Sequence, residues 1–210
     1  SAGSSNISLM DDTTPTAGEE AWDDVSGATA HSYGPTGLDT FFYQNSSMID
    51  GVTIGLDYIP SDGSDQIESS TAATIKYTGI DGLTIGAGMG EDNGEGPTDA
   101  DDVTAFNVTY AMDAISVGYS SYEVDSNASS SDTTLTAMGI SYAVSDDLSV
   151  SVNSAETQIE GSTDQEALGV SASLVIGSMT LSANHNSVEN VGGTSGKDRS
   201  GYALGLSFAF

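Results

Sequence analysis

The sequence predicts an all-β protein built from antiparallel strands, and three observations lead to this fold class. From Thr40 to the C-terminus, segments of about ten residues alternate apolar side chains with small or polar ones. Tight turns and longer polar loops separate these segments in alternation, as in a chain of hairpins. No segment approaches the roughly 18 consecutive apolar residues of a transmembrane helix. The fold class favoured is a transmembrane antiparallel β-barrel.

The expected strands follow from the turns and loops between them. Aspartates in four of the five tight turns recur at intervals of 31, 32 and 33 residues, namely Asp50, Asp81, Asp113 and Asp146. Two of these turns are Asp-Gly, which tolerates the positive φ of a short hairpin. Longer polar connections, expected on the solvent side, are Ser61–Ser69, Glu91–Asp101, Asp125–Asp132, Ile159–Asp164 and Glu189–Lys197. Eleven strands result, near 40–48, 51–59, 71–79, 83–90, 103–112, 114–123, 133–144, 148–157, 166–176, 179–188 and 200–210.

Each strand has one apolar face and one face of small or polar side chains. Alternation alone does not show which face is inside, so we use the positions of the tyrosines to distinguish a membrane barrel from a soluble one. Tyr77, Tyr110 and Tyr142 precede tight turns, and Tyr58, Tyr119 and Tyr202 lie near loop ends. Two such belts are typical of an aromatic girdle at the membrane interfaces. We therefore expect the apolar face to contact lipid and the small face, with Asp57 and Lys76, to line a lumen.

Residues 1–39 break the strand pattern and form a separate region ahead of the strands in residues 40–210. This region has the only tryptophan, Trp22, and no Lys or Arg. A connection of this length in a compact domain is functional or disordered, so either a loop with a function or a solvated acidic tail is expected. Its carboxylates are Asp11, Asp12, Glu19, Glu20, Asp23, Asp24 and Asp39.

Composition excludes several classes of function. With 3 Lys+Arg against 31 Asp+Glu and a formal net charge of -28, nucleic acid is not expected as a partner. No catalytic motif is found, so the chain is not expected to be an enzyme. No cofactor is expected either. Calcium at the acidic loops is the one metal hypothesis, and it is weak because residues 91–102 lack the spacing of a calcium loop.

Two stretches resemble the general bacterial porins. Residues 41–58 read F-F-Y-Q-N-S-S-M-I-D-G-V-T-I-G-L-D-Y, and the last strand ends on an aromatic residue, Phe210. The first looks like the stretch that follows the inward-folded constriction loop of a porin, and Phe210 looks like the C-terminal assembly signal of an outer-membrane barrel. The resemblance implies strands six to sixteen of sixteen, preceded by the constriction loop. Because single-chain bacterial barrels have an even number of strands, eleven alone cannot close into a barrel, and we expect five N-terminal strands to precede this sequence.

The resemblance also implies a function. It implies a homotrimer in the outer membrane of a Gram-negative bacterium, in contact with outer-membrane lipid. This trimer would be a passive, water-filled channel for small hydrophilic solutes and ions. The acidic residues of region 1–39 would form the pore constriction and make the channel cation-preferring. Porins usually oppose the acidic loop with a row of arginines, whereas this chain offers only Lys76, Lys197 and Arg199. Either the basic row lies on the preceding strands or the pore is acidic throughout.

Two alternatives share parts of this pattern. An acidic secreted or surface β adhesin or solenoid without channel activity would share the acidity and the Gly/Ser richness. It would not predict alternating short and long connections, because solenoid coils have a constant length. A twelve-stranded barrel, with an extra strand at Ile7 and Leu9, would need a strand too short to cross a membrane.

Overall fold

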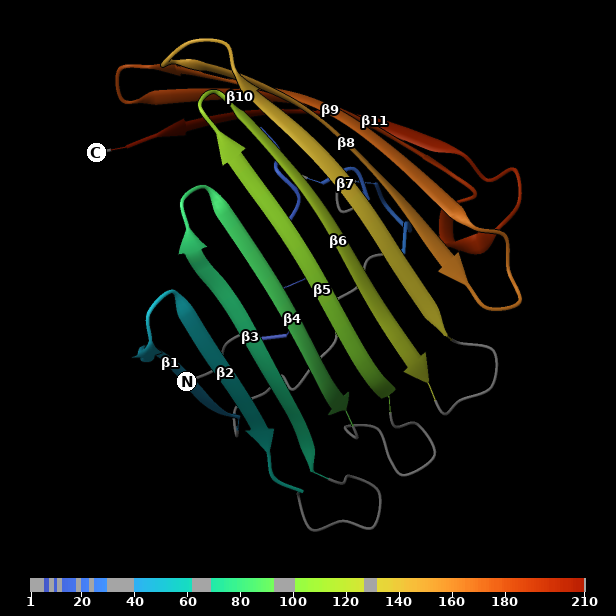
Figure 1. The fold of residues 1–210 in the computed structure, drawn as a ribbon. Helices are drawn as coiled ribbons and strands as arrows, with labels where there is room; N and C mark the ends of the chain where they lie inside the picture. Colours follow the sequence, from blue (N-terminus) through green and yellow to red (C-terminus); the bar gives the residue numbers. More distant parts are fainter. Residues whose placement is uncertain are drawn as a thin grey trace. The chain divides into compact units, whose positions relative to one another are not determined.

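The computed structural model describes residues 6–7, 10, 13–17, 20–22, 25–29, 40–61, 69–92, 101–126 and 132–209. The described residues form eleven β-strands (Figure 1). These are β1 (Phe41–Ile49), β2 (Val52–Ile59), β3 (Ser70–Ile80), β4 (Leu83–Asp92), β5 (Asp101–Met112), β6 (Ile115–Ser126), β7 (Thr133–Ala143), β8 (Leu148–Ile159), β9 (Gln165–Ile176), β10 (Met179–Glu189) and β11 (Arg199–Phe208). The expected all-β fold and the strand count are confirmed.

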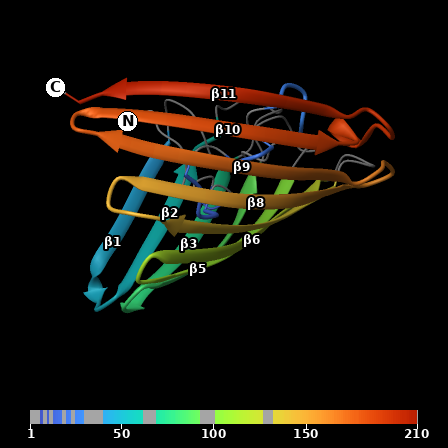
Figure 2. The ribbon, with the colours of Figure 1, turned by 90° about the horizontal axis from the view of Figure 1, so that it is seen from above.

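The strands follow one another in the sheet in the order of the sequence. The pairs with a described register, β1–β2, β2–β3, β3–β4, β8–β9, β9–β10 and β10–β11, are all antiparallel. Figure 2 shows β8 to β11 side by side in chain order. Among the described strands β1 and β11 end the order, and no pairing joins them.

The short turns have the backbone that their residues predict. Gly51 and Gly82 adopt φ of 71° and 72°, the left-handed region that glycine enters without a steric penalty. Asp113 takes the same region at φ 52°, as an aspartate in a tight turn can. The last long connection differs from the expectation of a simple loop, because Val191–Gly193 forms a short 3-10 turn, η2. Within the described part of the chain, no helix is long and apolar enough to cross a membrane.

The chain divides into two compact units. Unit 1 combines Ser1–Thr13, His31–Val108 and Ser120–Thr134, and unit 2 combines Thr14–Ala30, Thr109–Tyr119 and Leu135–Phe210. The start of the chain is thus shared between the units, and within each unit its described residues pack on strands that come much later in the sequence.

The apolar face of the strands is the exposed one. On β11 the outward side chains of Tyr202 and Leu204 are 84% and 78% exposed, and the same pattern holds on β2, β6 and β7. Exposure of a whole sheet face of this kind is what a lipid-facing surface requires. On β8 and β9 most of the small face is buried instead. This face is not polar throughout, because Tyr122 and Val124 are buried on it towards the loop ends of unit 1.

Candidate functional site

The described residues of the N-terminal segment (residues 6–29) lie against the small face of the strands. In unit 1 the contact is made by Asn6, whose backbone N–H donates to Oδ2 of Asp57 on β2 at 2.7 Å. The side-chain amide of Asn6 donates to the other carboxylate oxygen, Oδ1. The Asn6 amide oxygen also accepts from Gln44 on β1 at 3.4 Å. Asp57 is only 4% exposed, so its carboxylate is an anchor for the segment.

Two apolar residues continue this contact across β4. Ile7 and Met10 are buried, and a Cβ placed on Gly88 would lie 2.9 Å from Met10 Sδ and 3.3 Å from Ile7 Cγ1. A glycine inside a strand marks a place where another part of the molecule comes close. Gly88 therefore makes room for the segment.

In unit 2 the segment crosses β6 to β9 over a second set of small residues. A Cβ on Gly139 of β7 would lie 2.8 Å from the carbonyl oxygen of Pro15. Beyond it, the hydroxyls of Ser151 on β8 and Ser171 on β9 lie 2.6 Å apart. The Thr16 hydroxyl is 3.3 Å from both of them, and the backbone N–H of Ala17 donates to Ser151 Oγ at 2.7 Å. Small hydroxyl residues let the backbone of the segment approach and hold it there.

The middle of the segment is buried as well. The N–H of Ala21 donates to Oδ1 of Asn153 on β8 at 3.3 Å, and Trp22 is buried next to it in the chain. Glu20, predicted at the constriction, is also buried and accepts a hydrogen bond from the Thr14 hydroxyl at 3.3 Å. The Glu20 carboxylate thus contacts the segment itself.

The end of the segment contacts the loop ends of β9 and β11. Gln165 on β9 bonds the backbone of Thr29, and the guanidinium of Arg199 on β11 donates to the carbonyl oxygen of Ser26. Arg199, just ahead of the strand expected near 200–210, is the first residue of β11.

The other predicted site residues have different outcomes. Lys76 on β3 is exposed on the small face, between Thr53 and Gly86 of the neighbouring strands. Outside the described residues lie Asp11, Asp12, Glu19, Asp23, Asp24, Asp39 and Phe210. Their roles stay predictions.

The six predicted girdle tyrosines belong to the apolar face. Tyr58, Tyr110, Tyr119, Tyr142 and Tyr202 are all exposed on it. Tyr77 is less exposed, because its ring lies over Gly79 two residues further along β3. Tyr119 lies towards the middle of β6, since this strand extends to Ser126, and so it is not at a loop end as the sequence suggested. The girdle itself stays a prediction.

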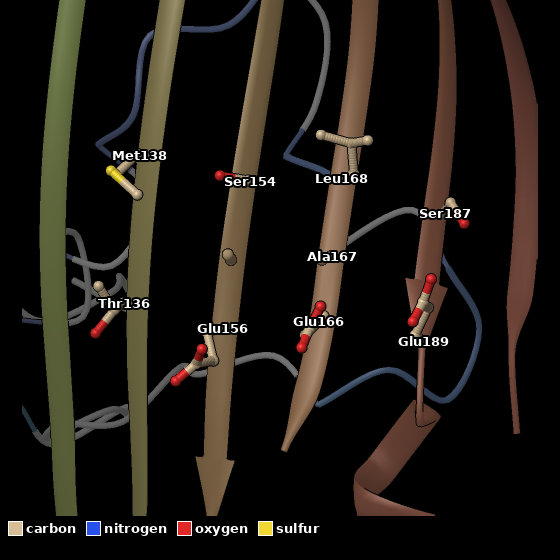
Figure 3. Close-up of a pocket in the computed structure, with 10 residues that line it drawn as sticks. Thr136, Met138, Ser154, Glu156, Glu166, Ala167, Leu168, Ser187 and Glu189 are labelled. Atoms are coloured by element: carbon tan, nitrogen blue, oxygen red, sulfur yellow. The ribbon is translucent and has the colours of Figure 1, made fainter. Parts of the chain in front are cut away.

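A groove of about 530 Å³ lies on the apolar face of unit 2, near the loop ends (Figure 3). Three glutamates from adjacent strands line it, with Glu166 opposite both Glu156 and Glu189. Met138 and Leu168 line its apolar part. Three carboxylates of the acidic chain therefore point away from the small face. Among the described residues, no group of three or more His, Cys, Asp or Glu could hold a metal ion.

Sequence reasoning missed the residues that seat the segment. One signal for them was present, since Gly88, Gly118, Gly139 and Gly169 all fall on the small face, each where a Cβ would meet the segment. The Ser151–Ser171 pair and Gln165 gave no such signal, because Ser and Gln are common on any polar strand face.

Comparison with known proteins concerns the family and the fold. A family profile described as Gram-negative porin matches residues 3–164. Among solved structures, OmpF of Salmonella typhi in complex with daunomycin has a TM-score of 0.66 at 12% identity, covering 80% of this chain and 61% of OmpF. OmpT, an outer-membrane protein of Vibrio cholerae, has a TM-score of 0.56 at 13% identity, with 80% and 63% covered. OccK10 of Pseudomonas aeruginosa has a TM-score of 0.56 at 11% identity, with 89% and 66% covered.

The chain therefore spans less than two thirds of the length of OmpF and OmpT. At these identities the likeness shows the fold, which is that of outer-membrane β-barrels. No curated protein sequence matches the chain.

Proposed function

This chain belongs to the Gram-negative porins, and we propose that it forms a passive, water-filled diffusion channel. Its place is the outer membrane, and the family and the fold indicate a channel rather than an enzyme. The solutes we propose are ions and small hydrophilic molecules, without a cofactor. The alternative of an adhesin or solenoid finds no support in the family or in the fold.

One observation carries the mechanism: the N-terminal segment packs on the small face, while the apolar face is exposed. A channel needs a polar interior and an apolar exterior, the reverse of a soluble barrel. The segment is held at Asp57 in unit 1, and at Ser151, Asn153, Gln165 and Arg199 in unit 2. A segment fixed on the inner wall narrows the lumen and sieves solutes by size.

We further propose that the channel prefers cations and that the segment supplies this preference. All inward positions of β8 to β11 are described, and none carries a carboxylate: they hold Ser, Thr, Asn, Gln, Gly, Ala, Val, Ile and Arg199. Apart from the cationic Arg199, the wall on these strands is an uncharged, hydrogen-bonding surface. We therefore propose that the carboxylates of the segment, including Asp11, Asp12, Asp23 and Asp24, supply most of the field that attracts cations.

The association state proposed is a homotrimer, in line with the family. The exposed apolar face of the strands offers surface both to outer-membrane lipid and to other subunits.

The experiment is single-channel recording of the purified full-length protein in planar lipid bilayers, with the reversal potential measured in a KCl gradient. We expect stepwise, long-lived openings and a reversal potential that indicates a preference for K⁺. Neutralising the segment by Asp23→Asn with Asp24→Asn should shift the reversal potential towards zero. Glu166→Gln on the outward groove removes a carboxylate from the other face and should leave it unchanged. Folded protein without conductance would contradict the proposed function.

A further inference from the structure

Gln165, the first residue of β9, is completely buried, and its side-chain amide has every hydrogen-bonding position filled. Its oxygen accepts from the N–H of Thr29 at 2.8 Å and from the N–H of Gly192 at 3.0 Å. Its nitrogen donates to the Thr29 carbonyl oxygen at 3.1 Å and to the Thr157 hydroxyl at 3.4 Å. A primary amide offers two donors and one oxygen with two lone pairs, so no capacity is left over.

These four bonds join parts of unit 2 that are distant in the sequence. Thr29 belongs to the N-terminal segment, Gly192 to the loop between β10 and β11, and Thr157 to β8. The two bonds with Thr29, one from its N–H and one to its carbonyl oxygen, resemble those that two directly paired residues exchange in an antiparallel sheet. They fix both the position and the orientation of the segment backbone. Gln165 is therefore the joint between the segment and the last long loop.

The loop on the other side of this joint is held by its own hydrogen bonds. Asn190 donates from its side chain to the Asp164 carbonyl oxygen at 3.1 Å and accepts from the N–H of Gly196 at 3.0 Å. The N–H of Val191 donates to the Lys197 carbonyl oxygen at 2.7 Å, and the Val191 side chain is fully buried. These bonds give the loop a defined conformation against which the segment can pack.

A second set of contacts holds the segment against the same loop and the start of β11. The Arg199 guanidinium donates to the Ser26 carbonyl oxygen. A Cβ on Gly27, whose φ is 81°, would lie 3.8 Å from Val191 Cγ1 and 3.5 Å from the Arg199 guanidinium. Residues 25–29 therefore lie against the last loop over several neighbouring residues.

We propose that Gln165 and the loop Asn190–Asp198 form a brace that positions the end of the segment and so sets the width of the pore. Gln165 is the positioning residue, and the proposal rests on the proposed function, since it assigns a role within that channel. A change that weakens the hydrogen bonds of this loop would therefore also release the end of the segment and widen the pore.

The amide of Gln165 is hard to replace. Glutamate could still accept from the N–H groups of Thr29 and Gly192, but it would bring a carboxylate against the Thr29 carbonyl oxygen and lose both donors. Leucine has a similar volume and makes none of the four bonds. Because a buried group left without its partner is costly, Gln165→Leu should raise the population of the released segment by at least about tenfold.

The test is single-channel conductance of the full-length protein carrying Gln165→Leu, with Gln158→Leu as the matched control. Gln158 is an exposed glutamine near the loop end of β8 that bonds only Glu156 among the described contacts. We expect larger conductance and more frequent switching between levels for Gln165→Leu, and wild-type currents for Gln158→Leu.

A second variant tests the loop without touching the segment or the wall. Asn190→Gly keeps the left-handed backbone of residue 190, at φ 52°, and removes its side-chain bonds to Gly196 in the loop and to the Asp164 carbonyl oxygen. We expect it to raise the conductance in the same direction as Gln165→Leu. If Gln165→Leu does not fold, Asn190→Gly and Thr29→Pro, which deletes the Thr29 N–H, carry the test.

The outcomes separate the two proposals. A wild-type protein that folds and does not conduct contradicts the proposed function. A conducting wild type whose folded brace variants show unchanged conductance and switching overturns the brace and leaves the channel in place.

Discussion

Single glycines on the small face show where the N-terminal segment crosses the strands. A strand glycine has no side chain to pack and weakens the strand, so its presence needs a reason. At Gly88 the reason is the Met10 side chain, and at Gly139 it is the backbone of Pro15. Gly201, on the same face of β11, has no atom within 4 Å of a Cβ built on it. The two kinds of glycine allow a matched test.

We predict that Gly139→Ala displaces the segment, whereas Gly201→Ala is tolerated. A methyl group on Gly139 would lie 2.8 Å from the Pro15 carbonyl oxygen, and backbone cannot rotate away as a flexible side chain can. Overpacking of this kind costs typically 1–3 kcal/mol, which the segment can relieve by moving off the wall. The expected result in planar bilayers is a larger conductance for Gly139→Ala only. Equal conductance of both variants would show that the segment does not narrow the pore.

The contacts of Asp57 and Gln165 illustrate what residue patterns could not predict. Asp57 was expected on the lumen wall and does face inward, but its partner Asn6 is 51 positions away. Gln165 bonds Thr29 across 136 positions. Such pairs depend on the path of the segment across the strands, and this path cannot be predicted from the local alternation or spacing of residues.

Strands and turns were the most predictable elements. The alternation of side chains fixes both the strand and the face of each residue, and Asp-Gly turns fix the register of the hairpins. The eleven expected strands are observed, with ends that differ by at most three residues, as at β6. These differences lie mostly at the loop ends, where backbone pairing continues into polar sequence and side-chain alternation no longer marks it.

We predict that neighbouring residues of β11 respond in opposite ways to a charge. Leu204 points outward in the middle of the strand, and Ala203 points inward, opposite Asn184. Leu204→Arg should lower the free energy of unfolding in lipid vesicles by about 2–4 kcal/mol, because it places a cation in hydrocarbon. In Ala203→Arg the new side chain faces the water of the lumen, so the free energy of unfolding should change by less than about 0.5 kcal/mol. Urea titration of the refolded protein measures both, and similar losses would contradict the assignment of the faces.

The distribution of charge over the chain differs from what its composition suggests. A net charge of -28 indicates an acidic pore, yet Glu156, Glu166 and Glu189 face outward and the inward side of β8 to β11 has no carboxylate. Asp57 and Glu20 are buried in contacts with the segment. Net charge is a property of the whole chain, so only the structure could separate the carboxylates that reach the lumen from those that do not.

This distribution predicts a channel whose selectivity depends strongly on salt. If the cation preference comes from a few carboxylates on the segment, each acts on passing ions through the water of the lumen. Their field is screened over about 10 Å at 0.1 M salt and about 3 Å at 1 M. The permeability ratio of K⁺ to Cl⁻, taken from reversal potentials, should therefore fall towards that of free diffusion between these concentrations, while conductance continues to rise. A ratio that stays constant would mean that ions bind the carboxylates directly, and attraction at a distance would then not explain the selectivity.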